Sequence, residues 1–234
     1  FRILRDVKLA NTEDLAVVLG ILGPFTMASW YIMDFETLSI TMYTDPDLVH
    51  EINEAVLDWT LQVLRLAAEE GGIDCVQISD DWGGTHSLLI SPDDFRTFFM
   101  PYFRRLVQGI KDLGLPVIMH NDGRIWDVLD ELVDCGIDAL HPVERAAGMD
   151  LKIVKEKYNG HLVPIGNINN KITMSSPNPE DIKNEVLECI KEAGLNGGYI
   201  ISTDHSIHDL MPVENVLYLV DLVKKYGKYP LFDE

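Results

Sequence analysis

Residues 75–84 read CVQISDDWGG, a short apolar segment that runs directly into two aspartates, a tryptophan and a pair of glycines. Five other apolar segments also end in polar residues: 16–22, 117–120, 138–141, 162–165 and 199–202. Segments that are apolar on both faces are typical of parallel strands covered by helices. The sequence therefore predicts six parallel strands, each followed by residues capable of chemistry.

Helices are predicted between these strands from capping residues and apolar spacing. The apolar side chains after Ser91 recur every three or four residues, which predicts one helix that continues through Ile110. No linker-like or low-complexity segment divides the chain, so the pattern favours a single α/β domain. The expected helix starts are at Asp45 with Pro46, Ser91 with Pro92, Asn178 with Pro179, and Met211 with Pro212.

Two α/β architectures fit this alternation. A doubly wound sheet places its ligands mainly at one switch point, whereas a (β/α)8 TIM barrel collects residues from the carboxyl ends of all its strands. Every predicted strand here ends in polar residues, which favours the barrel. A complete barrel has eight strands, so about two βα units are expected to lie upstream of Phe1 or to be absent. The expectation is one N-terminally incomplete barrel domain over residues 1–234.

Charge and composition exclude several classes of protein. The 234 residues include 38 Asp and Glu against 19 Lys and Arg, a net charge of −19, which excludes a nucleic-acid partner held by its phosphates. The uncharged window over residues 15–33 is as long as a membrane span, but Gly20, Gly23 and Pro24 interrupt it. We interpret it as a buried strand, a turn and a helix start. Three widely spaced cysteines indicate a reduced, cytoplasmic compartment.

The paired carboxylates Asp80 and Asp81 are the first candidates for catalysis. They follow a strand directly and precede glycines that let the backbone turn, so one carboxylate can face the mouth of a barrel. The alternative is an ordinary solvated turn.

A metal site is the second candidate. His120 and Asp122 are two residues apart at the end of an extended strand, so both side chains can point to one side, and His205 ends the last strand. Two imidazoles and a carboxylate suit a zinc-like divalent ion. The alternative is a neutral His120 and an Asp122 that caps the helix beginning near Arg124.

Other strand-end residues suggest supporting roles. Glu144, with His141, is interpreted either as a general acid or base or as a residue that orients metal ligands. Asn167 and Asn169 are expected to orient a polar ligand, although Asn beside Gly also forms turns. No dinucleotide, P-loop or α/β-hydrolase motif occurs.

At these strand ends the sequence resembles the uroporphyrinogen decarboxylase superfamily, which also contains corrinoid-dependent methyltransferases. The similarity extends over almost the whole chain. The matching segments are Gly23-Pro24-Phe25-Thr26, Asp81-Trp82-Gly83-Gly84, Gly166-Asn167-Ile168-Asn169, and His205-Ser206-Ile207 followed by Pro212, Glu214, Asn215 and Val216.

The resemblance implies a (β/α)8 barrel and an enzyme. Phe25, Thr26 and Trp82, which lie in the matching segments, are expected to contact substrate together with Asn167 and Asn169. In methyltransferase members a His-x-Cys and a late Cys hold zinc, and His120, Asp122 and His205 occupy the corresponding places here. Both cysteines are replaced, which removes soft thiolate ligands.

The leading expectation is a methyltransferase that uses this metal to pass a methyl group from a small methylated substrate to a corrinoid carried by a partner protein. The alternative is a metal-free lyase that decarboxylates uroporphyrinogen in porphyrin synthesis. The decarboxylase's Arg-rich segment would lie before Phe1, and Arg124 is the cation considered near a strand end. A third hypothesis is a non-catalytic barrel that binds a tetrapyrrole or a partner. A homodimer is compatible with each.

Overall fold

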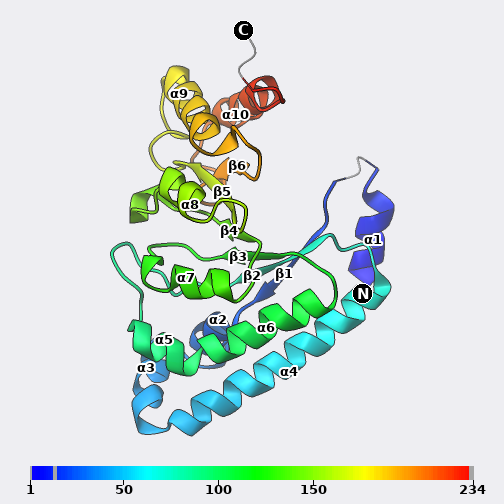
Figure 1. Ribbon diagram of the computed structural model, residues 1–234, viewed down its shortest axis with the longest axis vertical. Coiled ribbons are helices and arrows are strands. Elements are labelled where there is room, and N and C mark those ends of the chain that lie inside the picture. Colours follow the sequence, from blue (N-terminus) through cyan, green and yellow to red (C-terminus); the bar gives the residue numbers. More distant parts are fainter. Residues whose placement is uncertain (1, 13–14, 232–234) are drawn as a thin grey trace. The chain divides into compact units, whose positions relative to one another are not determined.

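The computed structural model describes residues 2–12 and 15–231, in which helices alternate with six parallel strands (Figure 1). The strands are β1 (Val18–Leu22), β2 (Cys75–Ser79), β3 (Val117–His120), β4 (Ala139–His141), β5 (Val163–Ile168) and β6 (Ile200–Thr203). The helices are α1 (Arg2–Ala10), α2 (Pro24–Thr26), η1 (Met27–Ile32), α3 (Phe35–Thr44), α4 (Pro46–Glu70), α5 (Pro92–Phe98), α6 (Met100–Asp112), α7 (Trp126–Asp134), η2 (Arg145–Ala147), α8 (Leu151–Lys157), α9 (Pro179–Cys189), η3 (Ile190–Gly194) and α10 (Val213–Tyr226). The predicted α/β class is confirmed.

The chain divides into two compact units. The first contains residues up to Trp82 together with 88–120 and 127–138, and the second contains residues 83–87, 121–126 and those from Ala139 onward. Strands β1, β2 and β3 pair in parallel in the first unit, and β4, β5 and β6 pair in parallel in the second. The single-domain organisation expected over residues 1–234 stays a prediction.

The register of the first unit aligns the ends of its strands. Leu22 pairs with Ser79, and Ser79 pairs with His120, so the loops after β1, β2 and β3 leave from one edge. Helices α4 and α6 pack side by side in this unit (Figure 1). Helix α4 begins as predicted, because the Asp45 side chain accepts the Leu48 N–H and Pro46 occupies the first turn.

The prediction of one continuous helix from Ser91 through Ile110 is wrong. The segment forms two helices, α5 and α6, which are separated at Phe99. Pro101 lacks an N–H, and its ring clashes with the carbonyl one turn earlier, so a helix cannot run through it unbroken. Phe99 takes φ −121° between the two helices and is fully buried. The apolar residues keep the same spacing on both sides of the break. The sequence pattern therefore does not reveal the break.

In the second unit β5 is longer than the predicted segment. The strand continues to Ile168, and Ile168 pairs with Thr203 of β6. Asn167 therefore lies within a strand rather than in the loop after it. Helix α9 begins as predicted, because the Asn178 side chain accepts the Glu180 N–H and Pro179 follows it.

The uncharged window over residues 15–33 folds as β1, α2 and η1. No helix among the described residues is long and apolar enough to cross a membrane. The interpretation of β1 as a buried strand is wrong, because Val18 is 46% exposed and every residue of the strand keeps some exposure. Among the described residues, β1 pairs with β2 alone, so one of its edges stays open.

Candidate metal and catalytic site

Asp80 occupies a buried position under the loop that follows β1. Its carboxylate accepts the N–H of Thr26 at 2.6 Å and, more weakly, that of Phe25 at 3.4 Å, and its side chain is fully buried. These are the unpaired N–H groups at the start of α2, so Asp80 satisfies a helix N-terminus. Burial raises the pKa of Asp80 to about 8, against the opposing effect of these N–H donors.

Gly23 is required by this arrangement. A Cβ at residue 23 would lie 2.2 Å from Cγ of Asp80, which is inside van der Waals contact. Thr26 adds a second link, because its Oγ1 accepts the Asp81 N–H at 3.0 Å. The catalytic role predicted for Asp80 therefore has a structural alternative: Asp80 and Thr26 fix the backbone that presents Asp81.

A pH effect on stability follows from the buried carboxyl of Asp80. Its pKa is about 8 when folded and about 3.9 when unfolded, so folding takes up a proton. This contribution is complete below pH ~4, declines as the pH rises and is lost above about pH 8. In metal-free protein, wild type should therefore lose stability relative to Asp80→Asn over this range, as measured by urea unfolding at several pH values. A pH-independent difference would contradict the assignment.

His120 and Asp81 form a histidine–carboxylate pair at the ends of β2 and β3 in the first unit. The backbone N–H of Asp80 donates to the His120 carbonyl at 3.0 Å, which fixes the two loop starts together. Nε2 of His120 lies 3.7 Å from Oδ1 of Asp81, and the two side chains are 19% and 40% exposed. Both groups are therefore accessible from solvent at this edge.

His205 and Asp122 form a second such pair, within the second unit. Nε2 of His205 lies 3.5 Å from Oδ2 of Asp122, and the side chains are 51% and 30% exposed. Neither pair is close enough for a good hydrogen bond. Two ligands at about 2.1 Å from a tetrahedral zinc ion lie about 3.4 Å apart, which is near both separations. The donor types and spacings of each pair therefore fit a shared divalent ion.

The loop that carries Asp122 is held tightly by its neighbours. The N–H of Gly83 donates to Oδ1 of Asn121 at 3.1 Å, and the N–H of Arg124 donates to the carbonyl of Gly84 at 2.8 Å. Gly123 has φ +86°, and a Cβ there would lie 2.5 Å from the Gly83 backbone, so only glycine fits.

Glu144 contributes directly to this loop. Its Oε2 accepts the N–H of Gly123, the residue after Asp122, at 2.7 Å. Of the two roles predicted for Glu144, the geometry supports the orienting one, because the carboxylate holds the backbone beside a candidate ligand. The general acid or base role stays a prediction.

Substituting Glu144 should separate these two roles. Glu144→Gln keeps an oxygen that can accept the Gly123 N–H, so metal affinity should stay near wild type while any proton transfer is lost. Glu144→Ala removes the acceptor and should weaken metal binding by about 10–100-fold, the usual effect of losing an outer partner. Competition titration with a chromogenic zinc chelator measures both. Equal affinities in the two variants would show that Glu144 does not orient the loop.

Asp204 is a buried carboxylate that sequence reasoning did not single out. It precedes His205 and is 3% exposed, and its Oδ1 accepts the Asn170 N–H at 2.9 Å. Burial raises the pKa of Asp204, the Asn170 N–H opposes this, and the charges of Glu144 and Glu185 raise it further. Asp204 directly precedes the candidate ligand His205 in the sequence, and this position could have identified it.

Arg145 was also missed, although it directly follows Glu144. Its guanidinium donates to Oδ1 of Asn167 at 3.2 Å and pairs with Glu185 at 3.5 Å and Glu188 at 3.4 Å. Arg145, like Arg124, therefore lies a few residues after the end of a strand. Two glutamates already compensate the charge of Arg145.

The two predicted ligand-orienting asparagines have internal partners. Nδ2 of Asn167 donates to the Val143 carbonyl at 2.9 Å, and its Oδ1 accepts from Arg145. Oδ1 of Asn169 accepts the Ile172 N–H at 2.7 Å, which is turn geometry. These contacts give both residues structural roles, and their predicted contacts with substrate stay predictions.

Phe25 and Trp82 lie in the core of the first unit, and neither has exposed surface. The Trp82 ring packs 4.6 Å from Phe95, and the Phe25 ring packs 5.2 Å from Phe99, measured between centroids. These rings have packing roles in the core, and the substrate contacts expected of them stay predictions. Thr26 is nearly as buried, at 8% exposed, and its Oγ1 supports the Asp81 backbone, while its predicted contact with substrate stays a prediction.

Strands and helices that alternate along the chain, with histidine and carboxylate groups after the strands, define an α/β protein built from βα repeats. The uroporphyrinogen decarboxylase (URO-D) family model matches residues 2–226, and the chain belongs to this family. A uroporphyrinogen decarboxylase from Thermus thermophilus is 28% identical over 95% of this chain, and the chain spans 64% of that relative's length. A uroporphyrinogen decarboxylase from a Geobacter species is 28% identical over 97% of this chain. The chain spans 66% of that relative's length.

Solved structures show the same fold. A methyltransferase from Methanosarcina mazei superposes with a TM-score of 0.76 at 24% identity, covering 96% of this chain and 63% of the other. A dihydropteroate synthase from Xanthomonas albilineans gives a TM-score of 0.51 at 14% identity, covering 92% of this chain and 68% of the other. At these identities the likeness concerns the fold alone.

Proposed function

We propose that this chain belongs to an enzyme that transfers a methyl group from a small methylated substrate to a corrinoid carried by a partner protein, with the help of a divalent metal. We assign the metal ligands to the two histidine–carboxylate pairs, Asp81 with His120 in the first unit and Asp122 with His205 in the second. The observation that supports this is the pair of histidine–carboxylate separations, 3.7 Å and 3.5 Å, near the ligand spacing of zinc.

The two pairs are adjacent in the sequence. His120 of the first pair and Asp122 of the second are separated by a single residue. Oxygen and nitrogen ligands without a thiolate give a harder site than the cysteine-containing sets of the methyltransferase members. Such a site suits a substrate that binds through oxygen or nitrogen better than one that binds through sulfur.

The metal would supply Lewis acidity at the heteroatom that carries the methyl group. The methyl–heteroatom bond would break with its electron pair left on the heteroatom, and the methyl group would pass to the corrinoid. Glu144, which orients the loop through the Gly123 N–H, would also deliver a proton to that heteroatom in the acid role predicted from the sequence. Asp80 and Thr26 hold the Asp81 backbone, and Gly123 places Asp122.

Decarboxylation of uroporphyrinogen is the second candidate, because the curated relatives at 28% identity carry that name. That substrate bears eight carboxylates, which need cationic partners. Arg145 is already paired with Glu185 and Glu188, and the chain has a net charge of −19, so the described part of the chain offers little attraction for such a substrate.

Parallel assays of the full-length protein distinguish the two reactions. The protein is mixed with cob(I)alamin and a panel of methyl ethers and methylamines, and separately with uroporphyrinogen. Our proposal predicts methylcobalamin in the first assay, detected by its absorbance, and no coproporphyrinogen in the second. Coproporphyrinogen formed equally by wild type and Asp122→Ala would overturn the proposal in favour of decarboxylation.

A further inference from the structure

An aromatic hollow opens at the surface of η1 and the start of α3 in the first unit. It has a volume of about 560 Å³, and its walls include Trp30, Tyr31, Ile32, Asp34 and Phe35. Trp30 and Tyr31 are 73% and 68% exposed, and Ile32 and Phe35 are 48% and 40% exposed. Large apolar side chains that gather on one face mark an interaction surface, whereas singly scattered ones do not. The hollow is therefore a candidate binding site.

The backbone of η1 is as unusual as its exposed side chains. It is a π-helix, in which the Met33 N–H donates to the carbonyl of Ala28, five residues earlier in the sequence, at 3.0 Å. Its buried residues are the small Ala28 and Ser29, while the large Trp30 and Tyr31 are exposed. Hydrophobic burial favours the opposite order, and π-helical turns are rare and frequent at functional sites. The local fold therefore presents these two rings for contact with a ligand.

The other walls of the aromatic hollow are held in place. The Phe35 ring packs edge-on against Phe25, with ring centroids 6.2 Å apart, and the Asp34 carboxylate accepts the Thr37 N–H at 2.7 Å. This backbone hydrogen bond lowers the pKa of Asp34, so its side chain is a carboxylate at neutral pH. Asp34 is the one charged residue among the described residues that line the hollow. A fixed aromatic wall and a fixed negative charge thus lie beside the exposed rings.

The charge of this part of the chain favours a cationic ligand. The sequence contains no Lys or Arg from residue 9 to residue 64, a stretch that includes all of η1 and α3, and the whole chain has a net charge of −19. Such a field raises the local concentration of cations. The faces of Trp, Tyr and Phe attract cations, and aromatic residues that surround a quaternary ammonium are the best-known use of this attraction. Methyl groups around the nitrogen also suit apolar walls.

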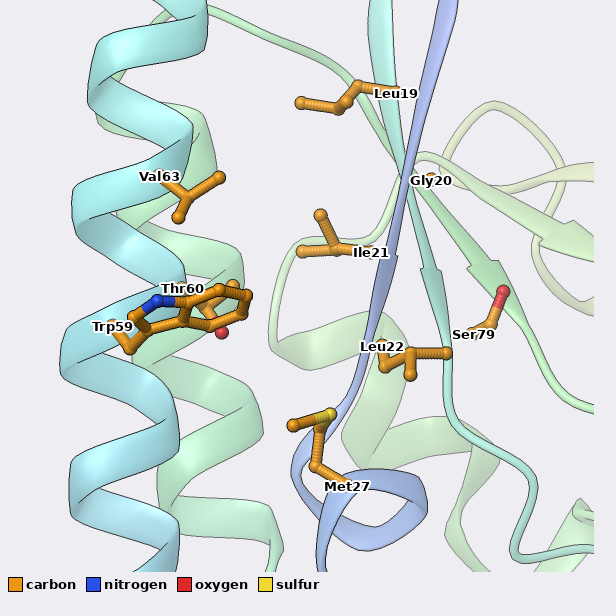
Figure 2. Close-up of a pocket in the computed structure, with 9 residues that line it drawn as sticks. All are labelled: Leu19, Gly20, Ile21, Leu22, Met27, Trp59, Thr60, Val63 and Ser79. Atoms are coloured by element: carbon orange, nitrogen blue, oxygen red, sulfur yellow. The ribbon is translucent and has the colours of Figure 1, made fainter. Parts of the chain in front are cut away.

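The pocket between α4 and β1 provides a contrast within the same unit. Figure 2 shows Trp59 on the helix facing Ile21 on the strand, and among the described residues that line this pocket Trp59 is the one aromatic residue and none is charged. Trp59 is 61% exposed, which is comparable to Trp30. This pocket therefore offers an exposed tryptophan without the carboxylate and the additional rings of the aromatic hollow.

We propose that the aromatic hollow binds the methylated ammonium group of a small cationic ligand. The rings of Trp30 and Tyr31 contact its methyl groups, and Asp34 balances its charge. The hollow follows β1, and the register of the strands places the end of β1 at the same edge as the Asp81–His120 pair. We identify the ligand with the methylated substrate, a step that rests on the function proposed above, whereas the binding itself does not. The cationic group is held in the hollow, and an oxygen or nitrogen elsewhere in the substrate is left for the metal.

Calorimetric titration of the full-length, metal-free protein tests this proposal without any turnover. The probes are choline and its uncharged carbon analogue, in which a tert-butyl group replaces the trimethylammonium group. We expect choline to bind at least about tenfold more tightly than the analogue, because the two have the same shape and only choline is attracted by aromatic faces and a carboxylate. Trp30→Leu should weaken choline binding about fivefold or more. Trp59→Leu, in the pocket of Figure 2, should leave it unchanged.

Asp34→Asn tests the contribution of charge. Asparagine keeps a side-chain oxygen that can accept the Thr37 N–H at the start of α3, so the helix should remain capped. Choline binding should weaken in this variant, while binding of the uncharged analogue should not change. Circular dichroism confirms that the three variants are folded.

Three results would overturn the proposal. They are the absence of choline binding, equal affinity for choline and the uncharged analogue, which would indicate a merely apolar surface, and equal weakening by Trp30→Leu and Trp59→Leu. The failure of the reaction is a separate outcome. Choline binding without methylcobalamin from any substrate would support the hollow and remove the methyl transfer. Methylcobalamin formed from methyl ethers by a protein that does not bind choline would do the reverse.

Discussion

Asp122→Ala should abolish methyl transfer together with metal binding at the pair that Asp122 forms with His205. Asp122 pairs with His205 at 3.5 Å and is held by a loop in which Gly123 donates to Glu144. Loss of an outer partner alone costs about 10–100-fold in metal affinity or activity, so loss of a ligand should cost more than about 100-fold. The rate of methylcobalamin formation and the metal content of the purified variant measure the two effects.

Asp134→Ala is the matched control for this prediction. Asp134 is an exposed aspartate at the end of α7, and its loss should leave both rate and metal content at the wild-type level. Full activity of Asp122→Ala, with the metal retained, would remove Asp122 from the ligand set.

Gly23→Ala should strongly destabilise the first unit. The added Cβ would lie 2.2 Å from Cγ of Asp80, which is itself fully buried and cannot move aside without losing the Thr26 N–H. Overpacking of this kind costs typically about 1–3 kcal/mol, and we expect the upper end because backbone and side chain must both shift. The midpoint of urea unfolding, with wild type measured in parallel, gives the change.

Gly20→Ala provides the comparison, since Gly20 lies three residues earlier on β1 and a Cβ there meets no atom within 4 Å. Its effect should remain within about 0.5 kcal/mol. Similar unfolding midpoints for Gly23→Ala and Gly20→Ala would show that the Asp80 contact does not constrain residue 23.

The strands were predictable because each apolar segment ends abruptly in polar residues. β2 and β3 begin and end where the sequence pattern places them, at Cys75–Ser79 and Val117–His120. β1 was predicted in the right place but as a buried strand. The apolar pattern of the sequence shows which side chains are apolar. It does not show whether another strand pairs with the edge of β1 that does not contact β2.

The residue types of the candidate site were predictable from the sequence. Which histidine pairs with which carboxylate was harder to predict. His120, Asp122 and His205 stand out as histidines and a carboxylate at strand ends, and the structure pairs Asp122 with His205. The pairing of His120 with Asp81 depends on the register of β2 against β3, which no local pattern encodes.

The role of Asp80 illustrates the same limit. Asp80 and Asp81 are adjacent and chemically identical, yet one is fully buried and the other is 40% exposed at its side chain. The difference arises because the N–H groups of Phe25 and Thr26, more than 50 residues earlier in the sequence, meet Asp80 in space. Arg145 was missed for a similar reason, since its contacts with Asn167 and Glu185 join segments far apart in the sequence.

Elemental analysis of protein purified without chelators tests the proposed metal site most directly. We predict bound divalent metal in wild type, a lower metal content in His120→Ala, and an unchanged content in His161→Ala, which removes an exposed histidine from the loop before β5. Circular dichroism confirms that both variants are folded. Equal metal content in wild type and folded His120→Ala would contradict the proposed site and the metal-assisted reaction built on it.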